Sequence, residues 1–328
     1  MNSFWAVVLL AGGLAILWKG ADLLVAGAVG LAKQFGVSSL IIGLTIVAMG
    51  TSAPEVAASI AGVLNKSNGG DLAVGNVFGS NIANLILVGG LVALIRPLKV
   101  QKLTLQREIP IMIAAALLLW PFLHNGSLSR PEAAILLTVF IVLIALTVYA
   151  AKREAKKAKL NEQKIDAEAE KYQINDTKKC IIFVITGLVG LALGARMTVT
   201  GAIYIGKETF GLSEGVIALT VIALGTSLPE LVTCVVAAVK GEHDISVGNL
   251  VGSNIFNTLL VTGAAGLVKP FNVTARFADG VDYWIMIGVS FVFAFVIILG
   301  RQTIGRVAGI VQLGGYGAYI FYLFSCGR

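Results

Sequence analysis

Residues 35–55 read FGVSSLIIGLTIVAMGTSAPE, and residues 210–230 read FGLSEGVIALTVIALGTSLPE. The two stretches align without gaps and share twelve of their twenty-one residues. A second pair follows at 71–84, DLAVGNVFGSNIAN, and at 244–257, DISVGNLVGSNIFN, with nine of fourteen residues identical. The chain therefore contains an internal duplication.

The composition around these motifs is that of a membrane protein. Of 328 residues, 57% are hydrophobic and 13% are charged, and the mean hydropathy is +0.87. Crossing a hydrocarbon core of about 30 Å takes roughly 20 mostly apolar residues as helix. Ten segments meet this requirement: 4–32, 38–63, 72–95, 108–123, 132–151, 180–205, 214–239, 245–268, 281–299 and 306–325. The first stays apolar too long for a cleaved signal peptide, so we interpret it as a span.

The longest polar interval, 152–179, separates five of these spans from the other five. Its many charges and few large apolar groups predict a solvated cytoplasmic linker. The expected domains are a first repeat at 1–151, with its motifs in 35–90, the linker, and a second repeat at 180–328, with its motifs in 210–265. Because each half has an odd number of spans, the halves cross the membrane in opposite directions. The predicted fold is an all-α polytopic membrane protein of ten transmembrane helices, arranged as two inverted five-helix repeats.

The basic residues predict an orientation. With the amino terminus outside, the inner connections hold seventeen Lys and Arg, and the outer segments hold six. The positive-inside rule then favours both termini on the outer, periplasmic side, and we expect a bacterial inner membrane. We attribute the net charge of +7 to this asymmetry and expect lipid, not nucleic acid, as the partner.

Each long motif interrupts its own helix with a proline. Pro54 lacks an amide hydrogen, so the carbonyl of Gly50 loses its helical partner and becomes available as a ligand. Pro229 does the same to the carbonyl of Gly225. Such breaks are tolerated in a membrane only where the backbone is buried in protein or lines a wet cavity. These two helices should therefore lie at the centre of the protein.

An acid follows each proline, at Glu55 and Glu230. A carboxylate deep in a span is costly, which makes each of these residues a candidate functional group. Hydroxyl groups three and four residues earlier share the helical face of each acid; they belong to Thr51, Ser52, Thr226 and Ser227. Carboxylates, hydroxyls and loosened carbonyls form an all-oxygen shell, which hard cations such as Ca²⁺ and Na⁺ prefer.

The next helix of each half has a polar row at four-residue spacing. The two rows are Asn76, Ser80 and Asn84, and Asn249, Ser253 and Asn257. Hydrogen bonding between helices, helped by small neighbours that allow close approach, explains such rows, and cation ligation is the alternative. For Asn76 and Asn249 we favour hydrogen bonding.

Three cysteines, Cys180, Cys234 and Cys326, are scattered along the chain. Their odd number and mostly apolar surroundings favour core packing over a disulfide framework or a metal cluster.

The two GTS(A/L)PE and two GSNI(A/F)N motifs resemble the alpha repeats of the calcium/cation antiporter superfamily. Among its branches the chain is similar to the sodium/calcium exchangers, and most similar to their bacterial YrbG-type members. The resemblance in length and span count covers essentially the whole chain. It implies a secondary active antiporter that exchanges Na⁺ for Ca²⁺ by alternating access, with no enzymatic activity and no cofactor besides the transported ions.

The resemblance also implies that the second, third, seventh and eighth spans enclose four adjacent cation sites. Ca²⁺ would be held by Glu55, Glu230, Thr51 and Thr226. The flanking Na⁺ sites would use Ser52, Ser80, Ser227 and Ser253, with the carbonyls of Ala48 and Ala223, while Asn84 and Asn257 would line the middle. The first and sixth spans would slide to switch access; their matched charges, Asp22 and Arg196, could equally be structural anchors.

The chain departs from some relatives at Asn257, where certain archaeal and potassium-dependent members have Asp. This difference disfavours K⁺ co-transport and removes any proton role of that residue. The proton/calcium branch typically carries Gly-Asn-Ala before its acid, so Na⁺ is favoured, with H⁺/Ca²⁺ antiport as the alternative. A cation channel, from a different class, could use the same ligands. An intramembrane protease is disfavoured, because the sequence has no HExxH motif and no Asp pair within two spans.

Overall fold

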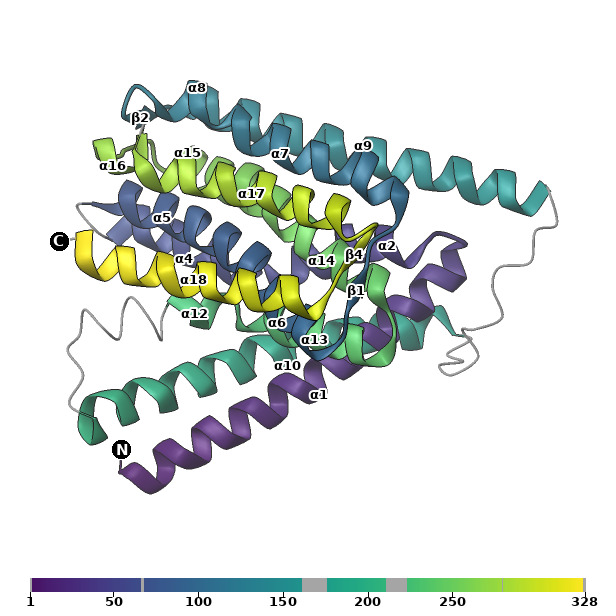
Figure 1. Ribbon diagram of the computed structural model, residues 1–328, viewed down its shortest axis with the longest axis horizontal. Coiled ribbons are helices and arrows are strands. Elements are labelled where there is room, and N and C mark those ends of the chain that lie inside the picture. The colour runs from purple at the N-terminus through teal and green to yellow at the C-terminus, as the bar shows by residue number, and fades with distance from the viewer. Residues whose placement is uncertain (1, 66–67, 161–175, 211–222, 279, 327–328) are drawn as a thin grey trace. The chain divides into compact units, whose positions relative to one another are not determined.

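The computed structural model of the chain describes residues 2–65, 68–160, 176–210, 223–278 and 280–326 (Figure 1). Helices dominate these residues, as the all-α prediction requires. Within them, nine helical stretches are long and apolar enough to cross a membrane: Ser3–Phe35, Ser39–Asn65, Gly69–Ile95, Thr104–Leu123, Arg130–Arg153, Thr177–Glu208, His243–Val268, Ala275–Leu299 and Arg306–Ser325. Helix is favoured because it satisfies every backbone polar group inside the segment.

The predicted seventh span, 214–239, falls partly on residues 211–222, which lie outside the described residues. Its described part consists of α12 (Ala223–Thr226) and α13 (Leu228–Lys240). The count of ten spans therefore stays a prediction. Most of the expected linker, at 161–175, also lies outside the described residues.

Large apolar side chains cover the outward faces of the long helices. On α10 (Thr177–Tyr204), Ile182 and Ile185 are each more than half exposed, and on α18 (Arg306–Cys326), Val307 and Phe321 are more than 70% exposed. Contiguous apolar surface of this kind is unusual on a water-soluble protein. It fits a chain whose surroundings are lipid.

Several spans are compound helices that change their hydrogen-bonding pattern. The second consists of α2 (Ser39–Ile42), the π-helix η1 (Gly43–Val47), α3 (Ala48–Thr51) and α4 (Ala53–Asn65). The third consists of α5 (Gly69–Ile82), η2 (Ala83–Val88) and α6 (Gly89–Ile95). The eighth has the same order: α14 (His243–Phe256), η7 (Asn257–Val261) and α15 (Thr262–Val268). Single-turn π-helices often mark functional sites.

The other helices and the strands of the described residues are as follows. The helical ones are α1 (Ser3–Phe35), η3 (Thr104–Glu108), α7 (Ile109–Leu118), α8 (Trp120–Leu123), α9 (Arg130–Leu160), η5 (Ile205–Thr209), α16 (Ala275–Ala278) and α17 (Val281–Leu299). Two antiparallel strand pairs also form, which the all-helical prediction did not include: β1 (Leu98–Lys99) with β4 (Thr303–Ile304), and β2 (Ser127–Leu128) with β3 (Phe271–Asn272). They join connections between helices and leave the fold class unchanged.

The chain divides into two compact units that do not coincide with the two halves of the sequence. Unit 1 comprises residues 1–51 and 141–249, and unit 2 comprises residues 52–140 and 250–328. Each unit therefore draws on both repeats. The division separates Thr51 from Ser52, and Asn249 from Leu250.

In unit 1, α1 and α10 lie side by side (Figure 1) and pack through glycines. A Cβ atom on Gly20 would lie 2.9 Å from the carbonyl oxygen of Gly187, and one on Gly187 would lie 2.7 Å from that of Gly20. Small residues allow such close backbone approach between membrane helices. A buried cluster that includes Leu17, Leu24 and Val184 fills the remaining space.

In unit 2, α4 packs against α5 and α15, and α6 packs against α18. Aromatic pairs add to the contacts: Phe78 and Tyr283 have ring centroids 5.8 Å apart, and those of Phe140 and Phe256 are 4.7 Å apart. The buried Tyr283 hydroxyl donates to the carbonyl of Ala116.

Candidate cation-binding site

The two GTS(A/L)PE motifs interrupt their helices at matched points, as the prolines predict. In the second span, Ser52 separates α3 from α4, and in the seventh, Ser227 separates α12 from α13. Helical hydrogen bonding resumes at once, because the amide of Val56 donates to the Ser52 carbonyl at 3.3 Å and that of Leu231 to the Ser227 carbonyl at 3.0 Å. Each acid therefore stands in the first turn of a new helix.

Glu55 and Glu230 are both completely buried, at 0% exposed surface. The first turn of a helix favours negative charge, because its amides point towards the group. Burial of a carboxylate is nevertheless costly unless donors or cations neutralise it. Two such carboxylates at matched positions can therefore attract a cation.

The twelve predicted ligands divide equally between the two units. The unit 1 ligand group is Ala48, Thr51, Ala223, Thr226, Ser227 and Glu230, and the unit 2 ligand group is Ser52, Glu55, Ser80, Asn84, Ser253 and Asn257. The structure brings ligands together within each of these groups.

In unit 1, α3 packs against α13, so the helix that contains Ala48 and Thr51 contacts the helix that contains Glu230. Thr51 and Ser227 are buried, and Thr226 is half-buried. The hydroxyl of Ser227 has no hydrogen-bond partner among the described residues, which leaves its oxygen available for a ligand. Ala223 belongs to α12, whose backbone continues into this break.

In unit 2, α4, α5 and η7 all contact one another. The elements of Glu55, Ser80 and Asn257 therefore pack together, and all three side chains are buried. Ser253 is buried one turn before Asn257 on α14.

Asn84 and Asn257 stand at matched places, at the starts of the π-helices η2 and η7. Both are completely buried, and neither the oxygen nor the nitrogen of either amide has a hydrogen-bond partner in the described part of the chain. Native proteins rarely leave buried amides unsatisfied. This matched pair is therefore the clearest indication of a ligand in unit 2.

Asn76 and Asn249 make the interhelical hydrogen bonds that we expected of them. The amide of Asn76 donates to Ser59 Oγ at 3.0 Å and to the Glu55 carbonyl at 3.2 Å. Asn249 accepts from the Thr51 hydroxyl at 3.0 Å and donates to Cys234 Sγ at 3.3 Å.

Ser59 and Cys234 were not predicted as partners of these amides. Each follows the acid of its repeat by four residues, so helical spacing from Glu55 and Glu230 could have found them. Cys180 and Cys234 are buried and form no disulfide among the described residues, in line with the expected core packing, while the side chain of Cys326 lies outside the described residues. Cys234 differs from a purely apolar core residue because it has polar contacts.

The structure adds a hydrogen bond between the second motif of the first repeat and the residue that directly follows the second motif of the second repeat. The Asn81 amide donates to Thr258 Oγ1 at 2.9 Å, and both side chains are buried in unit 2. Sequence matching could not predict this bond, because the two matched asparagines behave differently. Asn254, which matches Asn81, donates to the Leu250 carbonyl of its own helix.

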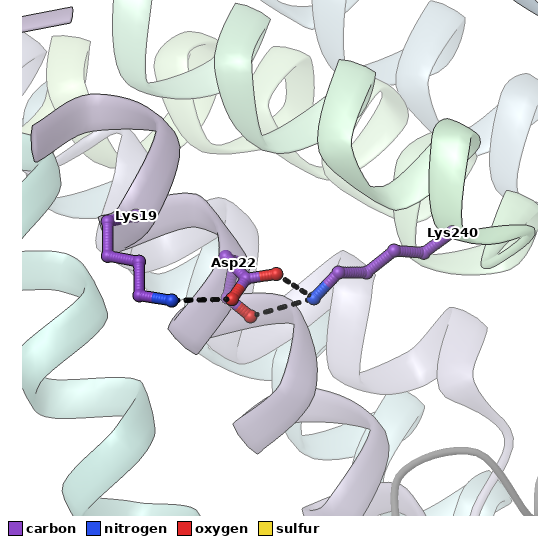
Figure 2. A network of polar contacts seen from close by, with 3 residues as sticks. All are labelled: Lys19, Asp22 and Lys240. Atoms are coloured by element: carbon purple, nitrogen blue, oxygen red, sulfur yellow. Dashed lines mark hydrogen bonds and ion pairs between the residues drawn. The ribbon is translucent and has the colours of Figure 1, made fainter. Parts of the chain in front are cut away.

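The structure also gives Asp22 a structural role in unit 1. Figure 2 shows Asp22 of α1 between Lys19, 3.6 Å away on the same helix, and Lys240 of α13, with which it forms an ion pair. Lys240 Nζ also donates to the Asp22 carbonyl at 3.2 Å. Asp22 thus connects α1 to the helix that contains Glu230 through an ion pair. Arg196, at the matching place on α10, is exposed.

Known proteins resemble this chain along almost its whole length. The sodium/calcium exchanger protein family matches residues 5–149 and 179–325. The inner membrane protein YrbG of Escherichia coli strain K12 is 36% identical over 97% of each chain. The sodium/calcium exchanger MaX1 of Methanosarcina acetivorans is 33% identical over 95% of this chain and 96% of its own. A structure of the sodium-calcium exchanger NCX_Mj, soaked with Na⁺ and no Ca²⁺, has a TM-score of 0.79 at 28% identity and covers 99% of both chains.

Proposed function

This chain belongs to the sodium/calcium exchanger protein family and is a Na⁺/Ca²⁺ antiporter; on that premise, we propose that the two ligand groups bind the exchanged ions in turn by alternating access. It is an integral membrane protein. Because YrbG is named an inner membrane protein, we assign the chain to a bacterial inner membrane. The excess of basic residues on the inner connections supports termini on the periplasmic side.

The observation that carries the proposed site is the pair of completely buried glutamates. The unit 1 ligand group contains one carboxylate, Glu230, and the unit 2 ligand group contains one, Glu55. Each of these buried carboxylates supplies a negative charge that favours cation binding by its own ligand group. Both Na⁺ and Ca²⁺ are attracted by such a charge, so the two cations can replace each other on the ligands of a group.

The neutral ligands fit the same exchange. Hydroxyls, amide oxygens and backbone carbonyls suit both Ca²⁺ and Na⁺, since both are hard cations. The orphaned amides of Asn84 and Asn257 and the hydroxyl of Ser227 supply oxygen atoms without competing hydrogen bonds from the described residues. A set with few charges binds weakly enough to release its ions, which a carrier needs and an enzyme's resident metal site does not. The proposal therefore assigns the chain no enzymatic reaction.

The test is Ca²⁺ uptake into proteoliposomes that contain Na⁺, K⁺ or a proton gradient. We expect uptake to require internal Na⁺. Uptake driven by the proton gradient would support H⁺/Ca²⁺ antiport instead, and uptake that needs no counter-ion would support a channel.

The site itself is tested by Glu55→Gln and Glu230→Gln. Each removes the only carboxylate of its ligand group, and we expect Na⁺-driven uptake to fall roughly a hundredfold or more. Glu132→Gln is the matched control, because Glu132 also stands in the first turn of a helix, α9, but is only half-buried and accepts from Ser129. Wild-type uptake by either buried-acid variant would contradict the proposed site.

A further inference from the structure

The hydroxyl of Thr51 has one hydrogen atom and two acceptors within reach. Asn249 Oδ1 lies 3.0 Å from Thr51 Oγ1, and the carbonyl oxygen of Ala48, in the preceding turn, lies 3.3 Å away. Thr51 and Asn249 are both buried, at 1% and 0% exposed surface, so water does not compete for the hydrogen. The shorter bond goes to Asn249, and the Ala48 carbonyl is left free to the extent that Asn249 holds the hydrogen.

A second contact fixes which end of the Asn249 amide meets Thr51. Asn249 Nδ2 donates to Cys234 Sγ at 3.3 Å, so the amide oxygen must face the other way, towards Thr51. Cys234 can accept because its own thiol donates to the Ser246 carbonyl at 3.5 Å, and the hydroxyl of Ser246 donates back to the Cys234 carbonyl at 3.1 Å. Cys234 and Ser246 are completely buried.

We propose that Asn249 is a positioning residue for Na⁺: by accepting the hydrogen of Thr51, it keeps the Ala48 carbonyl available to the bound cation. The inference rests on the proposed site, in which the Ala48 carbonyl is a Na⁺ ligand and Thr51 a Ca²⁺ ligand. Without Asn249 the Thr51 hydroxyl would donate to Ala48, and the carbonyl would then be shared between a hydrogen bond and the ion. Thr51 would still turn lone pairs outward. The loss should therefore be greater for Na⁺ than for Ca²⁺.

The matched asparagine of the first repeat does not do this. Asn76 is a donor to Ser59 and to the Glu55 carbonyl, and it is only half-buried. The positioning role is therefore assigned to Asn249 and not to Asn76. It depends on residues from both repeats, because Thr51 comes from the first and Asn249 from the second.

The experiment compares half-saturating concentrations of Na⁺ and Ca²⁺ in proteoliposomes. Asn249→Leu removes the acceptor at similar volume, and Cys234→Val removes the contact that orients the amide. We expect both to raise the Na⁺ concentration for half-maximal exchange about three- to tenfold, as for loss of one buried hydrogen bond. The Ca²⁺ value and the maximal rate per folded protein should change less than twofold.

Cys234→Ser is the conservative variant, since a hydroxyl can both donate to Ser246 and accept from Asn249, and it should keep wild-type constants. Tyr283→Phe, which removes a buried hydrogen bond in unit 2, controls for general loss of stability. A wild-type Na⁺ value for Asn249→Leu would overturn the inference. So would equal losses for both ions together with a lower maximal rate, which general packing damage produces.

The glutamate variants separate this inference from the proposed site. If Glu230→Gln is inactive and Asn249→Leu is unchanged, only the role of Asn249 is wrong. If Glu230→Gln transports normally, the site itself is wrong, whatever Asn249→Leu does.

Discussion

The two repeats preserve their ion ligands and differ in the residues that support them. Glu55 and Glu230 are equally buried, and Asn84 and Asn257 both lie in the first turn of a π-helix and have amides without hydrogen-bond partners among the described residues. Behind the acids, however, the first repeat has Ser59 where the second has Cys234. The two repeats thus keep the same ion ligands, while the residues that support those ligands differ between the repeats.

The matched glycines Gly75 and Gly248 show the same divergence in packing. A Cβ atom on Gly248 would lie 2.7 Å from the carbonyl oxygen of Leu40 and 2.9 Å from the amide nitrogen of Leu44, so backbone meets backbone there. A Cβ atom on Gly75 would meet only the ring of Phe277, at 3.2 Å. One sequence motif therefore supports a close helix crossing in unit 1 and a looser contact in unit 2.

The largest effect is expected when an acid is added to one repeat only, so that the ligands of the two repeats no longer match. Asn257→Asp would place a carboxylate on η7, which packs against the helix that contains Glu55. Crowded carboxylates resist simultaneous ionisation. Na⁺-driven Ca²⁺ uptake should therefore depend more strongly on pH, and the pH of half-maximal uptake should differ from the wild-type value by about one unit or more.

Uptake from pH 5.5 to 9, with and without K⁺, measures this effect. Asn84→Asp is the matched variant and should give a smaller change, because η2 packs against α17 and α18. Superimposable profiles for wild type and Asn257→Asp would remove residue 257 from the electrostatics of the site.

The glycine pair gives the next largest effect. Gly248→Ala forces a methyl group into a backbone crossing, and overpacking of this kind costs about 1–3 kcal/mol. Gly75→Ala should stay within about 1 kcal/mol of wild type, because the gain in helix propensity offsets a small shift of Phe277. Thermal unfolding midpoints of the purified protein in detergent measure both. Equal unfolding midpoints for the two variants would contradict the difference in helix packing at Gly248 and Gly75.

The smallest effect concerns the interval between the two motifs of each repeat, from the acid to the following Asp, which is two residues shorter in the second repeat. In the second repeat this interval contains Gly241, at φ 90°, and Glu242. Burial, and then the charge of Asp244, raises the pKa of Glu242 above its ordinary value, although Lys33 and Lys240 oppose the shift.

A raised pKa means that the folded chain binds the proton more tightly than the unfolded chain. The stability contributed by protonated Glu242 is therefore present at low pH and is lost as pH rises through the raised pKa. Glu242→Gln should match wild type near pH 4 and unfold at a slightly higher temperature near pH 7. A midpoint difference that stays constant between these pH values would contradict the assignment.

Much of the fold and of the candidate site could be predicted from the residues. The apolar segments predicted the described spans, and Pro54 and Pro229 predicted breaks that occur at Ser52 and Ser227. The π-helices were not predicted, because no residue type encodes a change from i−4 to i−5 hydrogen bonding. The lack of hydrogen-bond partners for the amides of Asn84 and Asn257 among the described residues could not be predicted either, because such partners depend on neighbours that are distant in sequence.

By itself, the sequence determined the membrane environment, the duplication and the types of ligand, because hydropathy, repetition and side-chain chemistry are local properties. Only the tertiary structure decided the partners of those ligands. Asn76 and Asn249 have identical chemistry and matched positions, yet one donates to Ser59 and the other accepts from Thr51, 198 residues away. Hydrogen bonds act over about 3 Å, so their partners depend on which helices pack together, and each copy of the motif packs against different neighbours.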